Sequence, residues 1–193
     1  MAGKDSRFAL TGLQSYLWSD GSFLAEGFIY QNGEYDSIFS IEGLNLLTYY
    51  NMSICPFGRG FLAAENISPK VLYMNTRLDT INTINFSLPS YIPPIKFTGS
   101  IETTLEEDYE WTGNWTQTGN VRALNDSIGV VCFQKNGVSE IGFFKPETGQ
   151  VLGFSKPIPG SLIDVDPNGR LVFISDEFDK QSVKLKIYNI HFQ

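Results

Sequence analysis

Residues 120–157 have the sequence "NVRALNDSIGVVCFQKNGVSEIGFFKPETGQVLGFSKP", and this stretch decides the fold. Four short apolar runs are separated by Asn125-Asp126, Asn136-Gly137 and Thr148-Gly149. Asn, Asp and Gly tolerate the backbone angles of tight turns. No apolar period of 3.6 residues, which would indicate a helix, runs through the stretch. The pattern therefore predicts a unit of four antiparallel strands.

The same pattern recurs on both sides of this unit. Residues 52–87 divide into four runs in the same way, and residues 161–190 give the first three runs of another copy. Repeats of about 40 residues with four strands each are typical of a β-propeller. We expect residues 1–193 to form one all-β domain, a small or partial propeller of four to five recognisable blades. A β-barrel or a sandwich is the alternative, and it would lack the rotational relation between units.

The first unit has an apparent surplus strand. Residues 7–12 precede a full set at 13–18, 22–30, 34–41 and 44–50. The last unit lacks its outer strand, so residues 8–11 are expected to pair with residues 184–190 and to close the ring. Closure would remove exposed strand edges. Between the second and third units, residues 88–119 predict either a protruding hairpin or a degenerate extra blade.

Composition limits the classes of partner. The chain is 42% hydrophobic and only 18% charged, which excludes a disordered chain. A net charge of −7 with scattered basic residues argues against nucleic acid. No apolar run is long enough for a membrane-spanning helix, and "MAGKDSRFAL" lacks the order of a secretion signal. The protein is expected in the periplasm or cell envelope if a leader was removed, and otherwise in the cytoplasm.

The segment "DVDPNG" at residues 164–169 is a candidate calcium loop. Asp164, Asp166 and Asn168 match the opening of such a loop, in which alternating oxygens face the ion. The twelfth position is Ser175 rather than Glu, so the usual bidentate carboxylate is missing. The alternative is a Pro-Asn-Gly corner of a β-hairpin. Calcium is the one cofactor that the sequence suggests.

A second candidate site lies in "LEEDYEWTGNWT", residues 105–116. In a strand, Tyr109, Trp111 and Trp115 share one face and could form a platform for a sugar or a protein partner. Alternatively, this face packs onto a neighbouring blade. Glu106, Glu107, Asp108 and Glu110 could supply the paired carboxylates of a glycoside hydrolase, or they could be a solvated loop.

Other catalytic chemistry has little support in the sequence. No nucleophile elbow, phosphate-binding loop, dinucleotide fingerprint or zinc-binding pattern occurs. Cys55 and Cys132 stand in apolar surroundings and are expected to be buried free thiols. His191, the only histidine, lies two residues from the end of the sequence and is not expected to act in catalysis.

Residues 7–43, "RFALTGLQSYLWSDGSFLAEGFIYQNGEYDSIFSIEG", resemble the TolB-like six-bladed β-propeller family of Bacteroides-type bacteria. The resemblance rests on a strand of the form Asp-Gly-x-Phe-x-Ala-x-Gly followed by a polar strand. It implies an exported envelope protein and no catalytic residue. Because the chain is too short for six full blades, we expect a homo-oligomer if the ring is incomplete. The predicted function is a non-catalytic binding or scaffolding module, and the alternative is a carbohydrate-active hydrolase.

Overall fold

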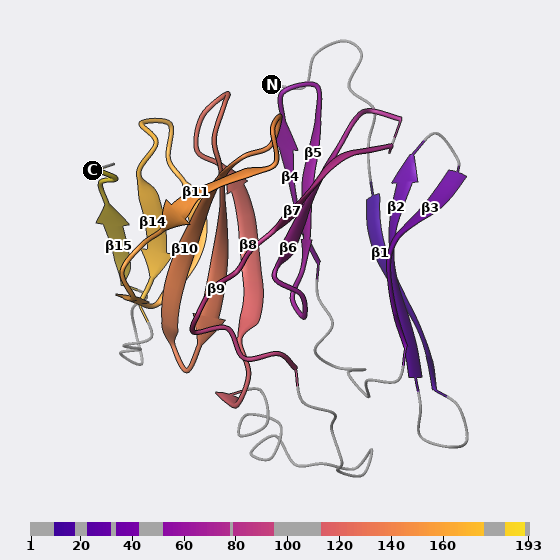
Figure 1. Ribbon diagram of the computed structural model, residues 1–193, viewed down its shortest axis with the longest axis horizontal. Helices are drawn as coiled ribbons and strands as arrows, with labels where there is room; N and C mark the ends of the chain where they lie inside the picture. The colour runs from indigo at the N-terminus through magenta and orange to yellow at the C-terminus, as the bar shows by residue number, and fades with distance from the viewer. Residues whose placement is uncertain are drawn as a thin grey trace. The chain divides into compact units, whose positions relative to one another are not determined.

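The structure is a computed structural model and describes residues 10–17, 23–31, 34–42, 52–77, 79–94, 113–175 and 184–191. These residues form an all-β chain with several antiparallel sheets, and none of the sheets in this part of the chain closes on itself. The strands fall into two compact units, one with β1 to β3 and the other with the remaining strands (Figure 1). The prediction of one domain over residues 1–193 stays a prediction.

The first unit contains a three-stranded sheet in the order β1-β2-β3, with bounds Leu10–Leu17, Phe23–Gln31 and Glu34–Glu42. The expected division into strands at 7–12 and 13–18 is wrong for the described residues, because residues 10–17 form one strand. Gly12, at the predicted boundary, pairs with Phe28 inside a continuous ladder. The predicted pairing of residues 8–11 with 184–190 includes residues outside the described ranges and stays a prediction.

The second unit contains three sheets in chain order. The first has the strands β4 (Met52–Phe57), β5 (Gly60–Glu65), β6 (Lys70–Met74) and β7 (Thr80–Asn85). The second has β8 (Gln117–Ala123), β9 (Gly129–Lys135), β10 (Val138–Lys145) and β11 (Gln150–Phe154), with the short β12 (Ile158–Pro159) added to β10. The third has β13 (Ser161–Val165), β14 (Leu171–Ile174) and β15 (Leu185–Tyr188). The predicted repeats thus correspond to a four-stranded sheet, a sheet of four main strands with a short fifth, and a three-stranded sheet.

The predicted turns join these strands. Asn136 and Gly137 have φ values of 49° and 72°, as a two-residue hairpin turn between β9 and β10 requires. The Asn125 side chain accepts hydrogen bonds from the amides of Ser127 and Ile128 between β8 and β9. Local side-chain chemistry therefore sets where the strands end.

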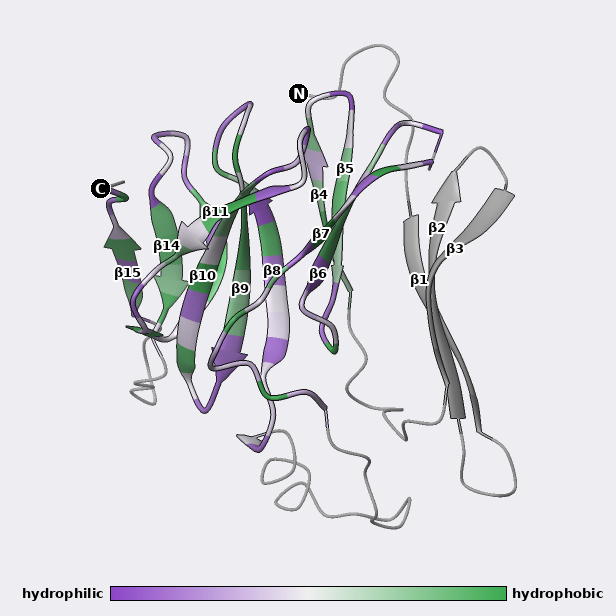
Figure 2. Ribbon diagram, in the orientation of Figure 1, coloured by the Kyte–Doolittle hydropathy of each residue, from purple (hydrophilic) through white to green (hydrophobic). Residues whose placement is uncertain are grey.

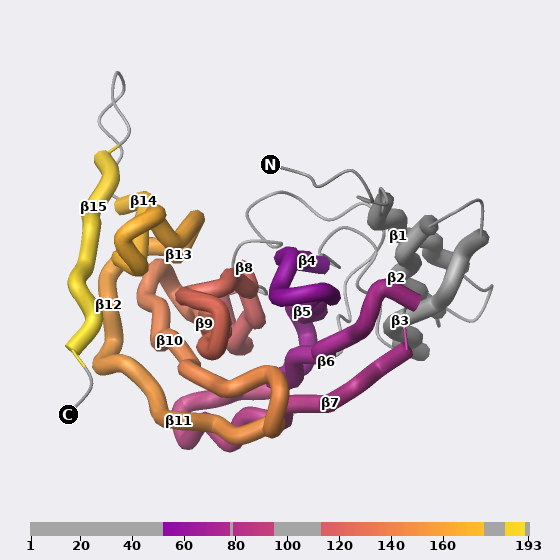
Figure 3. Tube along the Cα trace, turned by 90° about the horizontal axis from the view of Figure 1, so that it is seen from above, coloured from indigo at the N-terminus to yellow at the C-terminus, as the bar shows by residue number. Residues whose placement is uncertain are grey.

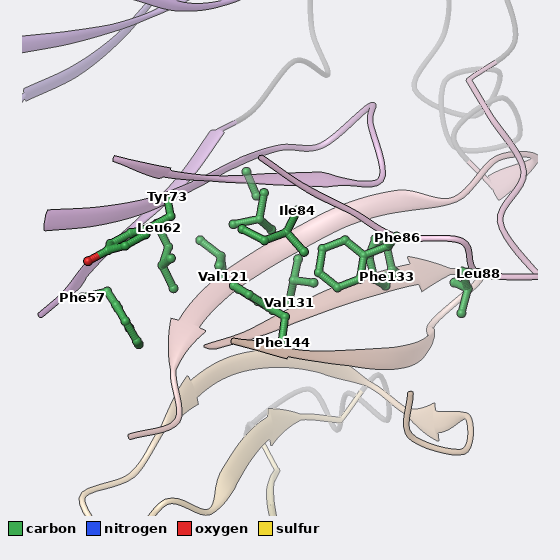
Figure 4. Packing of buried hydrophobic residues seen from close by; sticks show 12 residues of the cluster. Phe57, Leu62, Tyr73, Ile84, Phe86, Leu88, Val121, Val131, Phe133 and Phe144 are labelled. Atoms are coloured by element: carbon green, nitrogen blue, oxygen red, sulfur yellow. The ribbon is translucent and has the colours of Figure 1, made fainter. Parts of the chain in front are cut away.

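The sheet β8–β11 has apolar side chains on both faces. On β9, Val131 and Phe133 belong to a core shared with the sheet β4–β7, which Figure 4 shows in close-up. Val130 and Cys132, which alternate with them, belong to a second core shared with β13 and β14. Hydrophobic residues accordingly occupy most of β9 in Figure 2. The three sheets of this unit pack face on face, and Figure 3 shows them in succession from above.

An aromatic cluster joins the first two sheets of this unit. Phe86, directly after β7, lies with its ring centroid 5.3 Å from that of Phe133 and 5.5 Å from that of Phe144, both edge to face. Edge-to-face aromatic pairs stabilise a core beyond the area that they bury.

The first strand of the middle sheet, β8, bonds to both neighbouring sheets. The Val121 amide donates to the Ser53 hydroxyl on β4 over 3.0 Å. The Asn120 side chain donates to the Leu162 carbonyl on β13 over 2.7 Å. Polar groups of β8 thus find hydrogen-bond partners in both neighbouring sheets. These bonds hold the three sheets in register.

The two cysteines are free thiols, as expected. Cys132 is buried in the core between β8–β11 and β13–β14, whereas Cys55 is half buried against the core on the other face of the middle sheet. Burial raises the pKa of both thiols. Because the middle sheet separates them, the structure contains no disulfide between these two residues.

Candidate functional site

The candidate calcium loop forms the corner between β13 and β14. The Asp166 carboxylate accepts hydrogen bonds of 2.9 Å from the amides of Asn168 and Arg170. The Arg170 guanidinium donates to the same carboxylate over 2.7 Å from Nε and 2.6 Å from Nη2. Gly169 takes a φ of 72° and donates its amide to the Asp166 carbonyl. The segment therefore forms the corner of the β13–β14 hairpin.

These bonds change the electrostatics of the corner. The hydrogen bonds from Arg170, through its side chain and then its amide, hold the pKa of Asp166 below its usual value. Asp164 faces a different cation, because its Oδ1 lies 3.3 Å from Nε of Arg122. Both carboxylates are thus directed at arginines, and the described residues contain no cluster of three or more His, Cys, Asp or Glu that could hold a metal. Calcium binding at Asp164, Asp166 and Asn168 stays a prediction.

The predicted aromatic platform is only partly within the described residues. Trp115 is fully buried, so its ring has no surface to offer a ligand. Residues 113–116 precede β8 and are not in a strand, and the Thr116 amide donates to the Ile92 carbonyl over 2.8 Å. This corrects the expected strand face for Trp115. Tyr109 and Trp111 lie outside the described residues.

The acidic cluster also lies outside the described residues. Its members are Glu106, Glu107, Asp108 and Glu110. The carbohydrate-active hydrolase that would use them is therefore untested. The inserted hairpin or degenerate blade predicted at residues 88–119 falls largely in the same segment.

A pocket of about 470 Å³ opens between β11 and the segment around β15. Its apolar lining consists of Phe143, Leu152, Phe154, Ile158, Leu171 and Ile190. Phe143 and Leu171 are buried, and they belong to the core shared by the last two sheets. A pocket of this size, with polar as well as apolar surface, is large enough for a small molecule.

The polar lining consists of Ser155, Lys156, Tyr188, Asn189 and His191. The Ser155 hydroxyl accepts from the Ile141 amide over 2.9 Å and donates to the Lys156 carbonyl over 2.8 Å. These bonds fix the chain after β11 against β10 and so set the position of Lys156. The Tyr188 ring packs edge to face on Phe173, with a centroid separation of 5.3 Å, and holds the end of β15 in place.

This pocket was not predicted from the sequence. Lys156 follows the last strand of one unit, and Tyr188 and His191 end the next, so no motif joins them. His191 was set aside because of its place near the end of the sequence, yet it lines the pocket. The short β12, which pairs Ile158 with Ser139, turns the chain so that these segments meet. Pairing over two residues is too short to leave a pattern in the sequence.

No protein-family model matches the sequence, and no curated protein matches it. Among the residues that the structure describes, no helix is long and apolar enough to cross a membrane.

Proposed function

We propose that this chain is a non-catalytic binding module and that the pocket between β11 and β15 is its ligand site. The observation that carries the proposal is the pocket itself, about 470 Å³ in volume, whose lining combines apolar side chains with polar ones. Its described lining contains one lysine and one histidine but no carboxylate or thiol. Such a lining suits recognition of a ligand better than hydrolysis by paired acids.

The architecture that we propose for this module is a small or partial β-propeller. Three features support it: the sheets follow one another along the chain, each packs on the next through a shared apolar core, and β8 bonds to both of its neighbours. A TolB-like propeller of a bacterial cell envelope, with a protein or carbohydrate ligand, belongs to the same proposal. The proposal also includes closure of the ring, either within one chain or between copies of the chain.

A binding titration tests the function. The probe is N-phenyl-1-naphthylamine, a neutral aromatic amine whose fluorescence rises in apolar sites. Leu152 is 37% exposed and lines the pocket, so Leu152→Trp should occlude it without disturbing the core. We expect the full chain to bind the probe saturably and Leu152→Trp to weaken binding at least about tenfold, which corresponds to about 1.4 kcal/mol.

Val138 supplies the matched control. It is 41% exposed on β10 and is not part of the pocket lining, so Val138→Trp adds the same ring elsewhere. We expect this variant to bind the probe as the unmodified chain does. Equal binding by the unmodified chain and by both variants, or no saturable binding at all, would overturn the proposed site.

A further inference from the structure

We infer that the ligand of the pocket between β11 and β15 is a small amphipathic organic anion. This inference rests on the proposed function, and it concerns the chemistry of the ligand rather than the place of the site. It follows from the charges, hydrogen-bonding groups and apolar surface that meet at the pocket.

The charge of the lining differs from that of the chain. The whole sequence has 21 acidic residues against 14 Lys and Arg. The pocket lining nevertheless includes Lys156 and no Asp or Glu among the residues that the structure describes. A lysine without a carboxylate beside it leaves a local positive charge in an otherwise acidic protein, and such a charge favours an anion.

The polar side chains of the lining are available to a ligand. The structure gives no hydrogen bond or ion pair to the side chains of Lys156, Asn189 or His191 from any residue that it describes. By contrast, both carboxylates at the β13–β14 corner face arginines, and the Ser155 hydroxyl is used by the backbone. A carboxylate, sulfonate or phosphate group could accept hydrogen bonds from the ammonium and the amide together.

The apolar residues of the lining indicate the chemistry of the rest of the ligand. Leu152 is 37% exposed, and Phe154 and Ile190 are partly exposed, so these side chains offer the pocket's apolar surface to a ligand. Removing such a surface from water is favourable, so an apolar part of the ligand should bind against it. Together with an anionic group near Lys156, this apolar part describes an amphipathic anion.

Two probes that share one ring system distinguish the contribution of an anionic group to binding from that of apolar contact. One is 8-anilinonaphthalene-1-sulfonate, and the other is N-phenyl-1-naphthylamine, which lacks the sulfonate. We expect the full chain to bind the sulfonate at least about fivefold more tightly, the ratio that a partly exposed ion pair of about 1 kcal/mol gives. Lys156→Met should remove this preference and leave binding of the neutral probe unchanged. Lys145→Met, an exposed lysine of β10 outside the pocket lining, should change neither.

The outcomes distinguish the two proposals. If both probes bind equally, Lys156→Met changes neither, and Leu152→Trp weakens both, the site stands and its preference for anions is overturned. If Leu152→Trp affects neither probe, the proposed function itself is overturned. Loss of sulfonate binding alone in Lys156→Met, with Lys145→Met unchanged, supports the inference.

Discussion

Gly129 begins β9 at a point where two sheets come close together. A Cβ atom added there would lie 2.5 and 2.7 Å from ring atoms of Phe144 and 3.0 Å from Cδ1 of Leu62. Phe144 and Leu62 are both fully buried, so neither side chain can move aside into solvent. The missing side chain of Gly129 therefore allows β5 and β10 to share one core.

We predict that Gly129→Ala destabilises the protein by about 1–3 kcal/mol, the usual range for overpacking a core. Gly119→Ala on the adjacent β8 is the matched control, because its Cβ would meet Cys132 at an ordinary 3.4 Å. Urea denaturation followed by circular dichroism measures both. A loss in Gly129→Ala no larger than that in Gly119→Ala would show that the core between the sheets is looser than described.

Residues near the strand ends show which features of the fold can be predicted from the type of a single residue. Asn136, Gly137 and Gly149 were identified as turn residues from their types alone, and their positive φ values confirm it. For Trp115 the sequence leaves a ligand platform and packing in the core as alternatives, and its complete burial, next to a Thr116 that bonds to the distant Ile92, agrees with packing.

At the scale of an element, the β13–β14 hairpin shows that groups of the protein itself can bind the carboxylates of a segment that resembles a calcium loop. The Asp166 carboxylate holds two amides and the Arg170 guanidinium. We predict that Asp166→Asn keeps an acceptor for the amides but loses the ion pair, so that exchange of the Arg170 amide accelerates by less than about tenfold. Amide hydrogen exchange measured by NMR checks this, with Asp164→Asn as the control.

The effect should depend on pH in a definite direction. The pKa of Asp166 is lower in the folded chain than its ordinary value of 3.8. The ionised carboxylate therefore stabilises the folded hairpin fully above that value. The contribution is lost as the pH falls through the lowered pKa, so the difference between Asp166→Asn and the unmodified chain should be full at pH 7 and vanish in strong acid. Millimolar Ca²⁺ should leave the exchange rate at pH 7 unchanged. Slower exchange with Ca²⁺, abolished in Asp166→Asn, would instead establish the calcium loop.

Whole strands were predictable from the sequence where turn chemistry and alternation agreed. The four strands of residues 117–154 follow the predicted pattern because each apolar run ends at a residue suited to a turn. Residues 10–17 were divided in error, because a glycine inside a paired strand resembles a turn in sequence. The pocket was not predictable, because β11 and β15 come together only through the packing of complete sheets.

At the largest scale that the structure describes, the sheets of the second compact unit pack on one another through apolar faces. On the last sheet, Leu185 and Ile187 are 58% and 52% exposed and pair across the ladder with Ile174 and Val172. The middle sheet buries an apolar face on each side, and this exposed face of the last sheet is apolar in the same way. In the proposed propeller, a further blade would pack against it. The predicted pairing of residues 8–11 with residues 184–190 would cover the edge of β15 rather than this face.

The central claim is that the chain binds a ligand between β11 and β15, and an amide NMR map of the full 193-residue chain tests it most directly. The chain is titrated with 8-anilinonaphthalene-1-sulfonate. We predict that the shifted amides cluster at residues 152–156 and 188–191 and that Leu152→Trp abolishes the shifts. Shifts that cluster elsewhere, or that persist unchanged in Leu152→Trp, would contradict the account.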